Sequence, residues 1–310
     1  MYIMWVIDSI NDFKEQVLEQ KSISTKKIYL NNYNTITRLL KKPLVASTEL
    51  EMIDVINDMD NKPSTKRQLF NFLIVYFNWW NEVSTDKEQH FNVDILKKAR
   101  DEIWKLEEKS LTERKKITLD KIPAKITQLK NYLKDVYEKE EWLKYIINFL
   151  LINYHVRNKD LNLMIVVGLH YHQLNPNDNY LNIKNKGIEY IRNNYKTYKI
   201  YGTKIYTIKD KKFINAVQQY FAMYKNKYPT IHSLPLLNNN LARLQDESIA
   251  KAIQRATFKN LTESQYNDVI VSSIKSFKDI GKLKTIGERR GTDVKTLIKY
   301  YNLNVPVEDV

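Results

Sequence analysis

The sequence contains no cysteine, and this one absence removes several kinds of chemistry. Without thiols there is no disulfide framework, no thiolate nucleophile and no cysteine-ligated zinc. Any covalent step must therefore use Ser, Thr, Tyr, Lys or a carboxylate as its nucleophile. The lack of cysteine also favours an intracellular protein, whether in a nucleus, a viral factory or a bacterial cytoplasm.

Other familiar signals are missing as well. The apolar residues 1–6 are followed at once by Asp8, without a basic region or a cleavage site, so no signal peptide is predicted. Apolar runs such as 145–151 are too short to span a bilayer, and no membrane partner is expected. A Gly-rich phosphate loop, an acidic cluster and a Gly-x-Ser-x-Gly elbow are all absent, which argues against nucleotide hydrolases and esterases. His170 and His172 are expected on one face of a strand, but no third ligand is evident, so neither a metal nor a cofactor is implied.

What the sequence does have is an excess of positive charge. Its 310 residues, 43% of them hydrophobic, can form one large core or two modest ones. Lys and Arg number 50 against 36 Asp and Glu, which leaves a net charge of +14. Double-stranded DNA is a natural partner, because basic side chains that bind phosphates release condensed counterions. The alternative is that this charge serves solubility alone.

The N-terminal part reads as a small helical domain. Apolar residues recur at helical spacing over residues 24–40, 49–59, 64–80 and 93–109. The third segment is apolar on nearly all sides, so its Trp79 and Trp80 are interpreted as core residues rather than as a base-stacking platform. A polar and basic stretch follows at 110–116. We place the domain boundary there, between residues 1–110 and 111–310.

The second domain is predicted to combine helices with a small antiparallel sheet. An apolar helix over 142–154 leads into Arg157, Asp160 and Leu161. Short β-type runs follow at 180–183, 187–192 and 204–208, and helical segments at 211–224, 246–256 and 264–277. The expected fold class is therefore mainly α with a small antiparallel β-sheet, an α+β arrangement.

The basic segments and the tyrosine pair of this domain point to covalent chemistry on a phosphate. Lys196 lies in a basic hairpin between two predicted strands, and a basic turn with Arg289 and Arg290 precedes one short helix and then Tyr300 and Tyr301. A phenol, which titrates at about pH 10 in water, becomes a nucleophile when nearby cations favour its anion. The simpler interpretation is that both tyrosines pack one end of the domain.

Taken with Arg157 and Lys196, the tyrosine-bearing end resembles the tyrosine recombinase (integrase) family, and the resemblance covers nearly the whole chain. It implies a helical core-binding domain over 1–110 and a catalytic domain over 111–310. It also implies that DNA strands are cut through a 3′-phosphotyrosyl bond and rejoined, by a tetramer on two duplexes, as in integration or excision of a viral or mobile genome.

The resemblance assigns roles by position. Arg157 would hold the nonbridging oxygens of the scissile phosphate, and Lys196 would protonate the leaving 5′ oxygen. Tyr301 is the first candidate nucleophile and Tyr300 the second. A plain salt bridge between Arg157 and Asp160 is the competing interpretation of the arginine.

The lysines of the hairpin have a competing interpretation too. Lys199 and Lys204 are reserve candidates for the catalytic lysine and are predicted to contact DNA. Simple phosphate contact would explain any of these lysines equally well.

The resemblance is incomplete in two motifs. The family expects His-x-x-Arg and, later, a His or Trp after a glycine, yet neither side chain occurs beyond His232. By spacing, Asn267 stands at the arginine position and Thr292 at the His position. An amide in place of that guanidinium removes a charged donor, which costs about 2.7–4 kcal/mol of transition-state stabilisation in comparable sites. The cations that can replace it, all predicted to contact DNA, are Lys275, Arg289 and Arg290.

Two other functions fit the same residues. The first is a degenerate member of the family that acts as a sequence-specific DNA-binding or architectural protein. The second is a type IB topoisomerase, which shares the nucleophile. All three bind DNA with steep salt dependence, so the covalent step separates the binding protein from the two enzymes.

Overall fold

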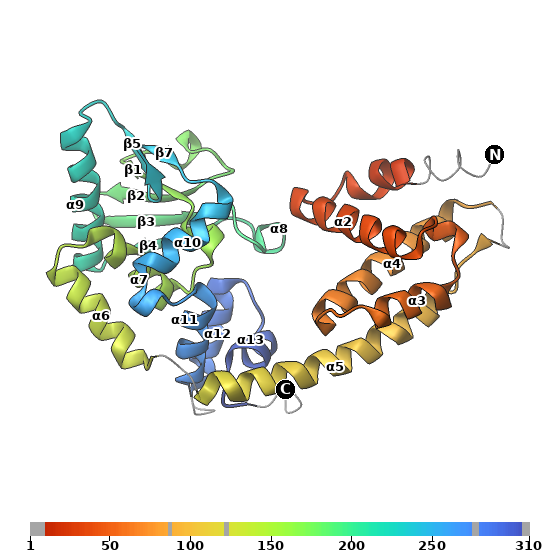
Figure 1. Ribbon diagram of the computed structural model, residues 1–310. Helices are drawn as coiled ribbons and strands as arrows, with labels where there is room; N and C mark the ends of the chain where they lie inside the picture. The colour runs from red at the N-terminus through yellow and green to blue at the C-terminus, as the bar shows by residue number, and fades with distance from the viewer. Residues whose placement is uncertain (1–9, 86–88, 121–123, 275–278, 306–310) are drawn as a thin grey trace. The chain divides into compact units, whose positions relative to one another are not determined.

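The computed structural model describes residues 10–85, 89–120, 124–274 and 279–305. The chain divides into two compact units, Met1–Glu113 and Arg114–Val310, which are treated separately below. Helices dominate both, and the second unit also contains a small five-stranded sheet and a two-stranded ribbon (Figure 1). The predicted class, mainly α with a small β-sheet, is confirmed.

The first unit is built from helices around an aromatic core. They are the π-helix η1 (Lys14–Leu18), α2 (Ile23–Leu40), α3 (Glu49–Asp58), α4 (Pro63–Val83) and the first part of α5 (Val93–Asp120). Ser22 caps α2 and Thr48 forms a capping box with Glu51 at α3. Trp79 is buried and packs edge to face against Phe13. Trp80 is half-buried and packs against the same core, so both tryptophans belong to the packing of this unit.

Helix α5 is longer than the sequence pattern predicted. It continues from Val93 to Asp120, through residues 110–116 that were expected to end it. This polar stretch contains neither Gly nor Pro, and Leu, Glu, Lys and Arg are all good helix formers. Polarity alone therefore did not mark a break in the helix.

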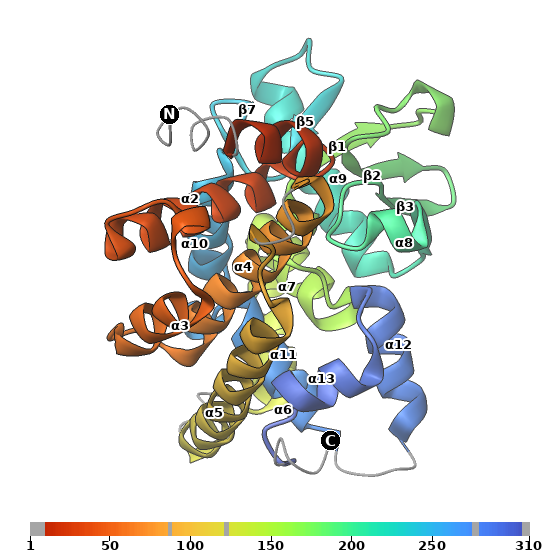
Figure 2. The same cartoon turned by 90° about the vertical axis from the view of Figure 1, so that its right-hand side faces the viewer.

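The second unit packs helices around a central apolar helix. Its longer helices are α6 (Ile126–Glu138), α7 (Trp142–Tyr154), α9 (Lys211–Lys227), α10 (Asp246–Ala256), α11 (Glu263–Ser272), α12 (Ile280–Arg290) and α13 (Val294–Tyr301). Every residue of α7 from Tyr145 to Ile152 is buried, and α6, α9, α10 and α11 all contact this helix. Helices α11, α12 and α13 lie together at one end of the unit (Figure 2).

The sheet has the strand order β4-β3-β2-β1-β5, with α9 beside it (Figure 1). The strands are β1 (Leu163–Val167), β2 (Asn179–Lys184), β3 (Gly187–Arg192), β4 (Lys204–Ile208) and β5 (Ser233–Pro235). The three predicted strands correspond to β2, β3 and β4. Because β1 runs parallel to β2, the sheet is mixed rather than wholly antiparallel. A separate two-stranded ribbon pairs β6 (Asn238–Asn239) with β7 (Ala242–Arg243).

Two local predictions differ from the structure. His170 and His172 do not lie on a strand: His170 precedes a 3₁₀ turn, η5 (Tyr171–Gln173), which contains His172. Arg289 and Arg290 do not lie in a loop between two elements. They are the last two residues of the helix α12, whose C-cap Gly291 has a left-handed φ of 66°. Throughout the part of the chain that is described, no helix has the length and apolar character needed to cross a membrane.

Candidate functional site

A cavity of about 370 Å³ collects most of the predicted catalytic positions. It is lined by Arg157, Lys196, Thr197, Gly291, Thr292, Asp293, Thr296, Tyr300 and Tyr301. These residues come from the loop after α7, from the connection between β3 and β4, and from α13 with the link that precedes it. Segments far apart in the sequence thus place a guanidinium, an ammonium and two phenols around one space.

Arg157 reaches this cavity because of the way α7 ends. His155 ends the helix in the left-handed conformation with φ 52°, and Arg157 then precedes the 3₁₀ turn η4 (Asn158–Leu161). Its backbone N–H donates to Asp160 Oδ2 at 2.8 Å, and its Nη2 donates to Thr292 Oγ1 at 2.8 Å. Its Nη1 is buried and has no hydrogen-bond partner in the described structure. Burial first, and then the charge of Arg290, lowers the pKa of Arg157.

Tyr301 is held by Arg290. Arg290 Nη2 donates to the Tyr301 hydroxyl at 3.0 Å, and its guanidinium lies 4.8 Å from the centre of the phenol ring. The same nitrogen donates to Glu263 Oε1 at 2.5 Å, while Nη1 donates to the His155 carbonyl at 3.3 Å. Burial alone would lower the pKa of Arg290, but Glu263 and Tyr301 raise it. The hydroxyl that lines the cavity is therefore in contact with a fixed positive charge.

Asn267 is close to this cluster but does not line the cavity. It is 1% exposed on α11, and its Nδ2 donates to the carbonyl of Glu263 at 3.0 Å and to Glu263 Oε1 at 3.1 Å. Glu263 Oε1 thus accepts from both Asn267 and Arg290. The amide at the predicted arginine position is therefore linked to Arg290 and Tyr301 by the carboxylate of Glu263.

The predicted lysines lie on the connection between β3 and β4 or beside it. Lys196 is exposed in the turn before the short helix α8 (Tyr198–Tyr201), and it lines the cavity. Lys199 is exposed on α8 and does not line it. Lys204, on β4, donates instead to the carbonyl of Glu288 on α12 and stacks 4.8 Å from the ring of Tyr201.

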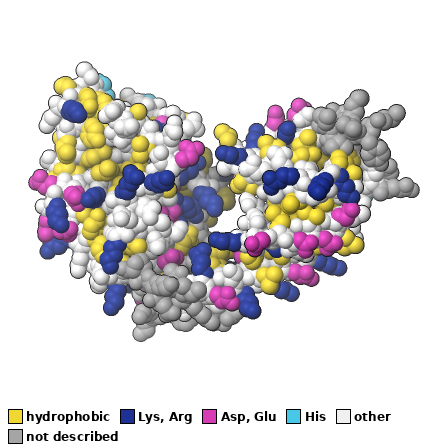
Figure 3. Space-filling model, in the orientation of Figure 1, with side chains coloured by type: hydrophobic (Ala, Val, Ile, Leu, Met, Phe, Trp, Pro, Cys, Tyr) yellow, Lys and Arg dark blue, Asp and Glu magenta, His cyan; other side chains and the backbone are white. Residues whose placement is uncertain are grey.

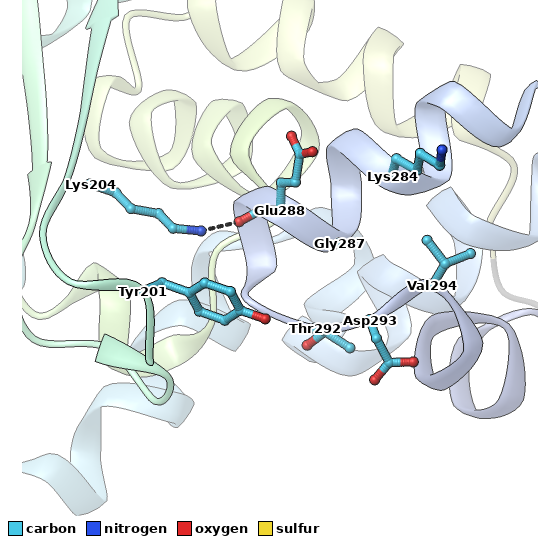
Figure 4. A pocket seen from close by; sticks show the side chains of 8 residues that line it. All are labelled: Tyr201, Lys204, Lys284, Gly287, Glu288, Thr292, Asp293 and Val294. Carbon is cyan, nitrogen blue, oxygen red and sulfur yellow. Dashed lines mark hydrogen bonds between the residues drawn. The ribbon is translucent and has the colours of Figure 1, made fainter. Parts of the chain in front are cut away.

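A second hollow of about 230 Å³ adjoins the first (Figure 4). Tyr201, Lys204, Lys284, Gly287, Glu288, Thr292, Asp293 and Val294 line it, so Thr292 and Asp293 belong to both cavities. Figure 4 shows Lys204 reaching from the strand to the end of α12. This contact joins β4, the strand that follows the connection with Lys196, to the helix that carries Arg290.

The remaining predicted DNA contacts have different surroundings. Arg289 donates to the carbonyl of Asn153 and lies 5.0 Å from the ring of Tyr154, so its guanidinium does not line the cavity. Arg290 is 2% exposed. Lys275 lies outside the described residues. On the face shown in Figure 3, basic side chains are scattered over each unit with acidic ones among them.

Sequence reasoning missed two residues that support this site, Glu263, which accepts from Arg290, and Arg192. Arg192, at the end of β3, is fully buried; its Nη2 donates to Asp160 Oδ2 at 2.6 Å and its Nη1 to the carbonyl of Arg289. The signal was available, because the strand 187–192 alternates so that an arginine falls on the same side as Ile188 and Tyr190, both buried. A charge on a buried strand face needs a partner, here a carboxylate next to Arg157.

Comparisons with known proteins add little to this geometry. No protein-family model matches the chain, and no curated protein matches it. Among solved structures, "Crystal structure of XerA recombinase" is similar with a TM-score of 0.34 and 13% identity, over 96% of this chain and 93% of that chain. A likeness this weak carries no argument, so the roles of the site residues stay predictions that depend on the residues themselves.

Proposed function

We propose that the protein binds double-stranded DNA and cleaves and rejoins its strands through a covalent bond to Tyr301. The observation that carries this proposal is the single cavity that Arg157, Lys196 and Tyr301 line together. These are the positions that the sequence predicted for a phosphate-binding cation, a proton donor and a nucleophile. The net charge of +14 supports a polyanionic substrate.

The proposed step is an exchange of one phosphodiester for another. The Tyr301 oxygen attacks phosphorus and its phenolic proton leaves to solvent, while the bond from phosphorus to the 5′ oxygen breaks. Lys196 gives that oxygen a proton and regains one from water, so the products are a 3′-phosphotyrosyl bond and a 5′ hydroxyl. Arg157 binds the nonbridging oxygens as negative charge grows on them. The reverse reaction rejoins a strand without ATP, because the ester energy is kept in the phosphotyrosyl bond.

Tyr301 is preferred to Tyr300 because of its hydrogen bond. Both phenols line the cavity, but the Tyr301 hydroxyl accepts from Arg290 at 3.0 Å. This contact fixes the attacking oxygen beside a positive charge. Thr292, where the family has His, accepts from Arg157, so its own hydroxyl proton is available to a phosphate oxygen.

The wider setting of this activity comes from the family resemblance. It implies a tetramer on two duplexes, and integration or excision of a viral or mobile genome, in a nucleus, a viral factory or a bacterial cytoplasm. Residues 1–110 would grip the duplex as a core-binding domain and residues 111–310 would carry the chemistry.

The test is a covalent trapping assay. Duplexes that the protein retains from a random pool are resynthesised with a nick beside each candidate scissile phosphate, so that the cut fragment diffuses away and the adduct accumulates. An adduct on denaturing gels is expected with the unaltered chain and with Tyr300→Phe, but not with Tyr301→Phe. Arg157→Ala and Lys196→Ala are expected to slow it by about 100-fold or more. Lys186→Ala, an exposed lysine in another turn, is the matched control.

The second candidate function is DNA binding without cleavage, and the amide of Asn267 at the arginine position favours it. A mobility shift on the selected duplexes without any adduct would establish this function and exclude both enzymes. An adduct that forms equally on unrelated sequences would instead indicate a type IB topoisomerase.

A further inference from the structure

We propose that Arg290 supplies the second phosphate-binding cation of the site, in place of the arginine that Asn267 does not provide. The inference rests on the proposed function and adds a catalytic residue to it. Its basis is that the buried guanidinium of Arg290 contacts the Tyr301 hydroxyl. The same guanidinium shares the carboxylate of Glu263 with Asn267.

Arg290 does not itself line the cavity, but several contacts hold it against Tyr301, which does. It is 2% exposed in the last turn of α12, yet its Nη2 lies 3.0 Å from the oxygen of Tyr301. Its Nη1 donates to the His155 carbonyl, two residues before Arg157 in the chain. Its Nε is buried and has no hydrogen-bond partner among the described residues. A guanidinium held in this way needs little reorganisation to follow charge that forms at Tyr301.

Glu263 connects this arginine with position 267. Its Oε1 accepts from Arg290 Nη2 at 2.5 Å and from Asn267 Nδ2 at 3.1 Å. A long cationic side chain at 267 would therefore point toward the carboxylate that Arg290 already occupies. Because one carboxylate cannot compensate two buried cations, a short neutral residue at 267 is the complement of an arginine at 290. Glu263 acts as a positioning residue that keeps Arg290 charged inside the fold.

The chemistry expected of Arg290 follows from its contact with the nucleophile. When the Tyr301 oxygen bonds to phosphorus, the charge of the phenolate moves onto the nonbridging oxygens. Arg157 lines the cavity and Arg290 contacts the reacting hydroxyl, and each has a buried N–H that has no partner within the described structure. Loss of one such donor from a preorganised site slows the chemical step by about 100- to 1,000-fold.

The test measures adduct formation in single turnover on the nicked duplexes, at protein concentrations that saturate the DNA. Arg290→Met keeps the volume of the side chain and removes its charge; it is expected to slow the adduct by about 100- to 1,000-fold with little change in DNA affinity. Arg290→Lys should slow adduct formation less than Arg290→Met does. The double variant Asn267→Arg/Arg290→Ala should recover at least about tenfold over Arg290→Ala, because the new guanidinium reaches the same carboxylate. Arg255→Ala, an exposed arginine on α10, is the control.

A neutral substrate separates catalysis from a structural role. If Arg290 neutralises charge on the phosphate, a methylphosphonate at the scissile position should shrink the effect of Arg290→Met to about tenfold or less. Equal slowing on both substrates would mean that Arg290 only holds α12 and α13 together, and would overturn the inference. The inference would also be overturned if Arg290→Met formed the adduct within about threefold of the unaltered rate. That result would not contradict the proposed function. No adduct from the unaltered chain would overturn the proposed function and this inference with it.

Discussion

Asp160 and Arg192 form an ion pair at 2.6 Å in which neither side chain is exposed to solvent. The same oxygen of Asp160 also accepts the backbone N–H of Arg157 at 2.8 Å. Through its other terminal nitrogen, Arg192 donates to the carbonyl of Arg289, the residue before Arg290. One buried arginine on a strand therefore positions the backbone beside both guanidinium groups of the candidate site.

Arg192→Met is predicted to destabilise the protein strongly. The substitution leaves the Asp160 carboxylate buried without its cation, and breaking a buried pair from one side costs about 3–5 kcal/mol. Urea denaturation at pH 7, followed by circular dichroism, gives the free energy of unfolding. Lys134→Ala, which removes an exposed pair with Glu138, should cost less than about 1 kcal/mol.

The double variant Arg192→Met/Asp160→Leu makes this prediction sharper. The double variant replaces both charged side chains by apolar ones. It should therefore lose less free energy of unfolding than the sum of the losses in the two single variants. Strict additivity would show that the two side chains do not compensate each other.

Helices with strong local signals were predicted well from the sequence. The expected ranges 142–154 and 246–256 coincide with α7 and α10, because apolar spacing marks both segments. Strands β1 and β5 were missed. The run at β1 is apolar throughout and only five residues long, so its pattern does not show alternation, and β5 depends on pairing with β1 across a large separation in sequence.

The candidate site was predictable only as a set of residue types. Motif order selected Arg157, Lys196 and Tyr301, and the fold brings all of them to one cavity. The contact of Arg290 with Tyr301 could not be read from the sequence, because it depends on where α12 ends relative to α13. Arg289 is adjacent and chemically identical, yet helix geometry directs it to Asn153 instead.

Gly291→Ala is predicted to disturb the cavity as well as the stability. The left-handed φ of 66° disfavours a side chain, and a Cβ here would lie 2.0 Å from Thr197 Oγ1. We expect a loss of more than about 2 kcal/mol in the free energy of unfolding. Gly281→Ala, which changes a glycine inside α12 with open space around it, should be neutral or stabilise by up to about 1 kcal/mol. Thermal and urea unfolding of both variants compare the two glycines directly.

A partial rescue tests the proposed cause. Thr197→Ala added to Gly291→Ala removes the clashing oxygen and leaves only the backbone strain, so about half of the loss should return. If the added change returns nothing, the close approach of Thr197 is not the source of the cost.

Asp268→Asn is predicted to stabilise the protein in mild alkali. Burial raises the pKa of Asp268 to about 7, against the opposing charges of Arg114, Arg290 and Lys115. The folded state therefore holds this proton more tightly than the unfolded state, and stability is lost as the pH rises from about 4 to 7. The neutral amide avoids that loss. The change in the free energy of unfolding caused by Asp268→Asn should therefore be more favourable at pH 8 than at pH 4 by up to about 4 kcal/mol. Asp54→Asn, on an exposed face of α3, is the control in the same denaturation series.

His155 is predicted to make the protein sensitive to acid. Burial first, and then the charges of Arg289 and Arg290, lowers the pKa of His155 from 6.5 to about 3. Between these values the unfolded state binds a proton that the folded state does not, so stability present above pH 6.5 is lost as the pH falls toward 3. At pH 4.5 the loss is about 2.7 kcal/mol, two pH units at about 1.36 kcal/mol each.

The measurement compares His155→Asn with the unaltered chain at pH 7.0 and pH 4.5. Asparagine tolerates the left-handed backbone that His155 adopts at the end of α7 and carries no titrating ring. The variant should therefore lose about 2 to 3 kcal/mol less than the unaltered chain over this interval, whatever the carboxylates contribute to both. His232→Asn, which changes an exposed histidine, should follow the unaltered chain. Parallel losses in all three proteins would show that His155 accepts its proton in the folded state, and that the two arginines beside it tolerate the added charge.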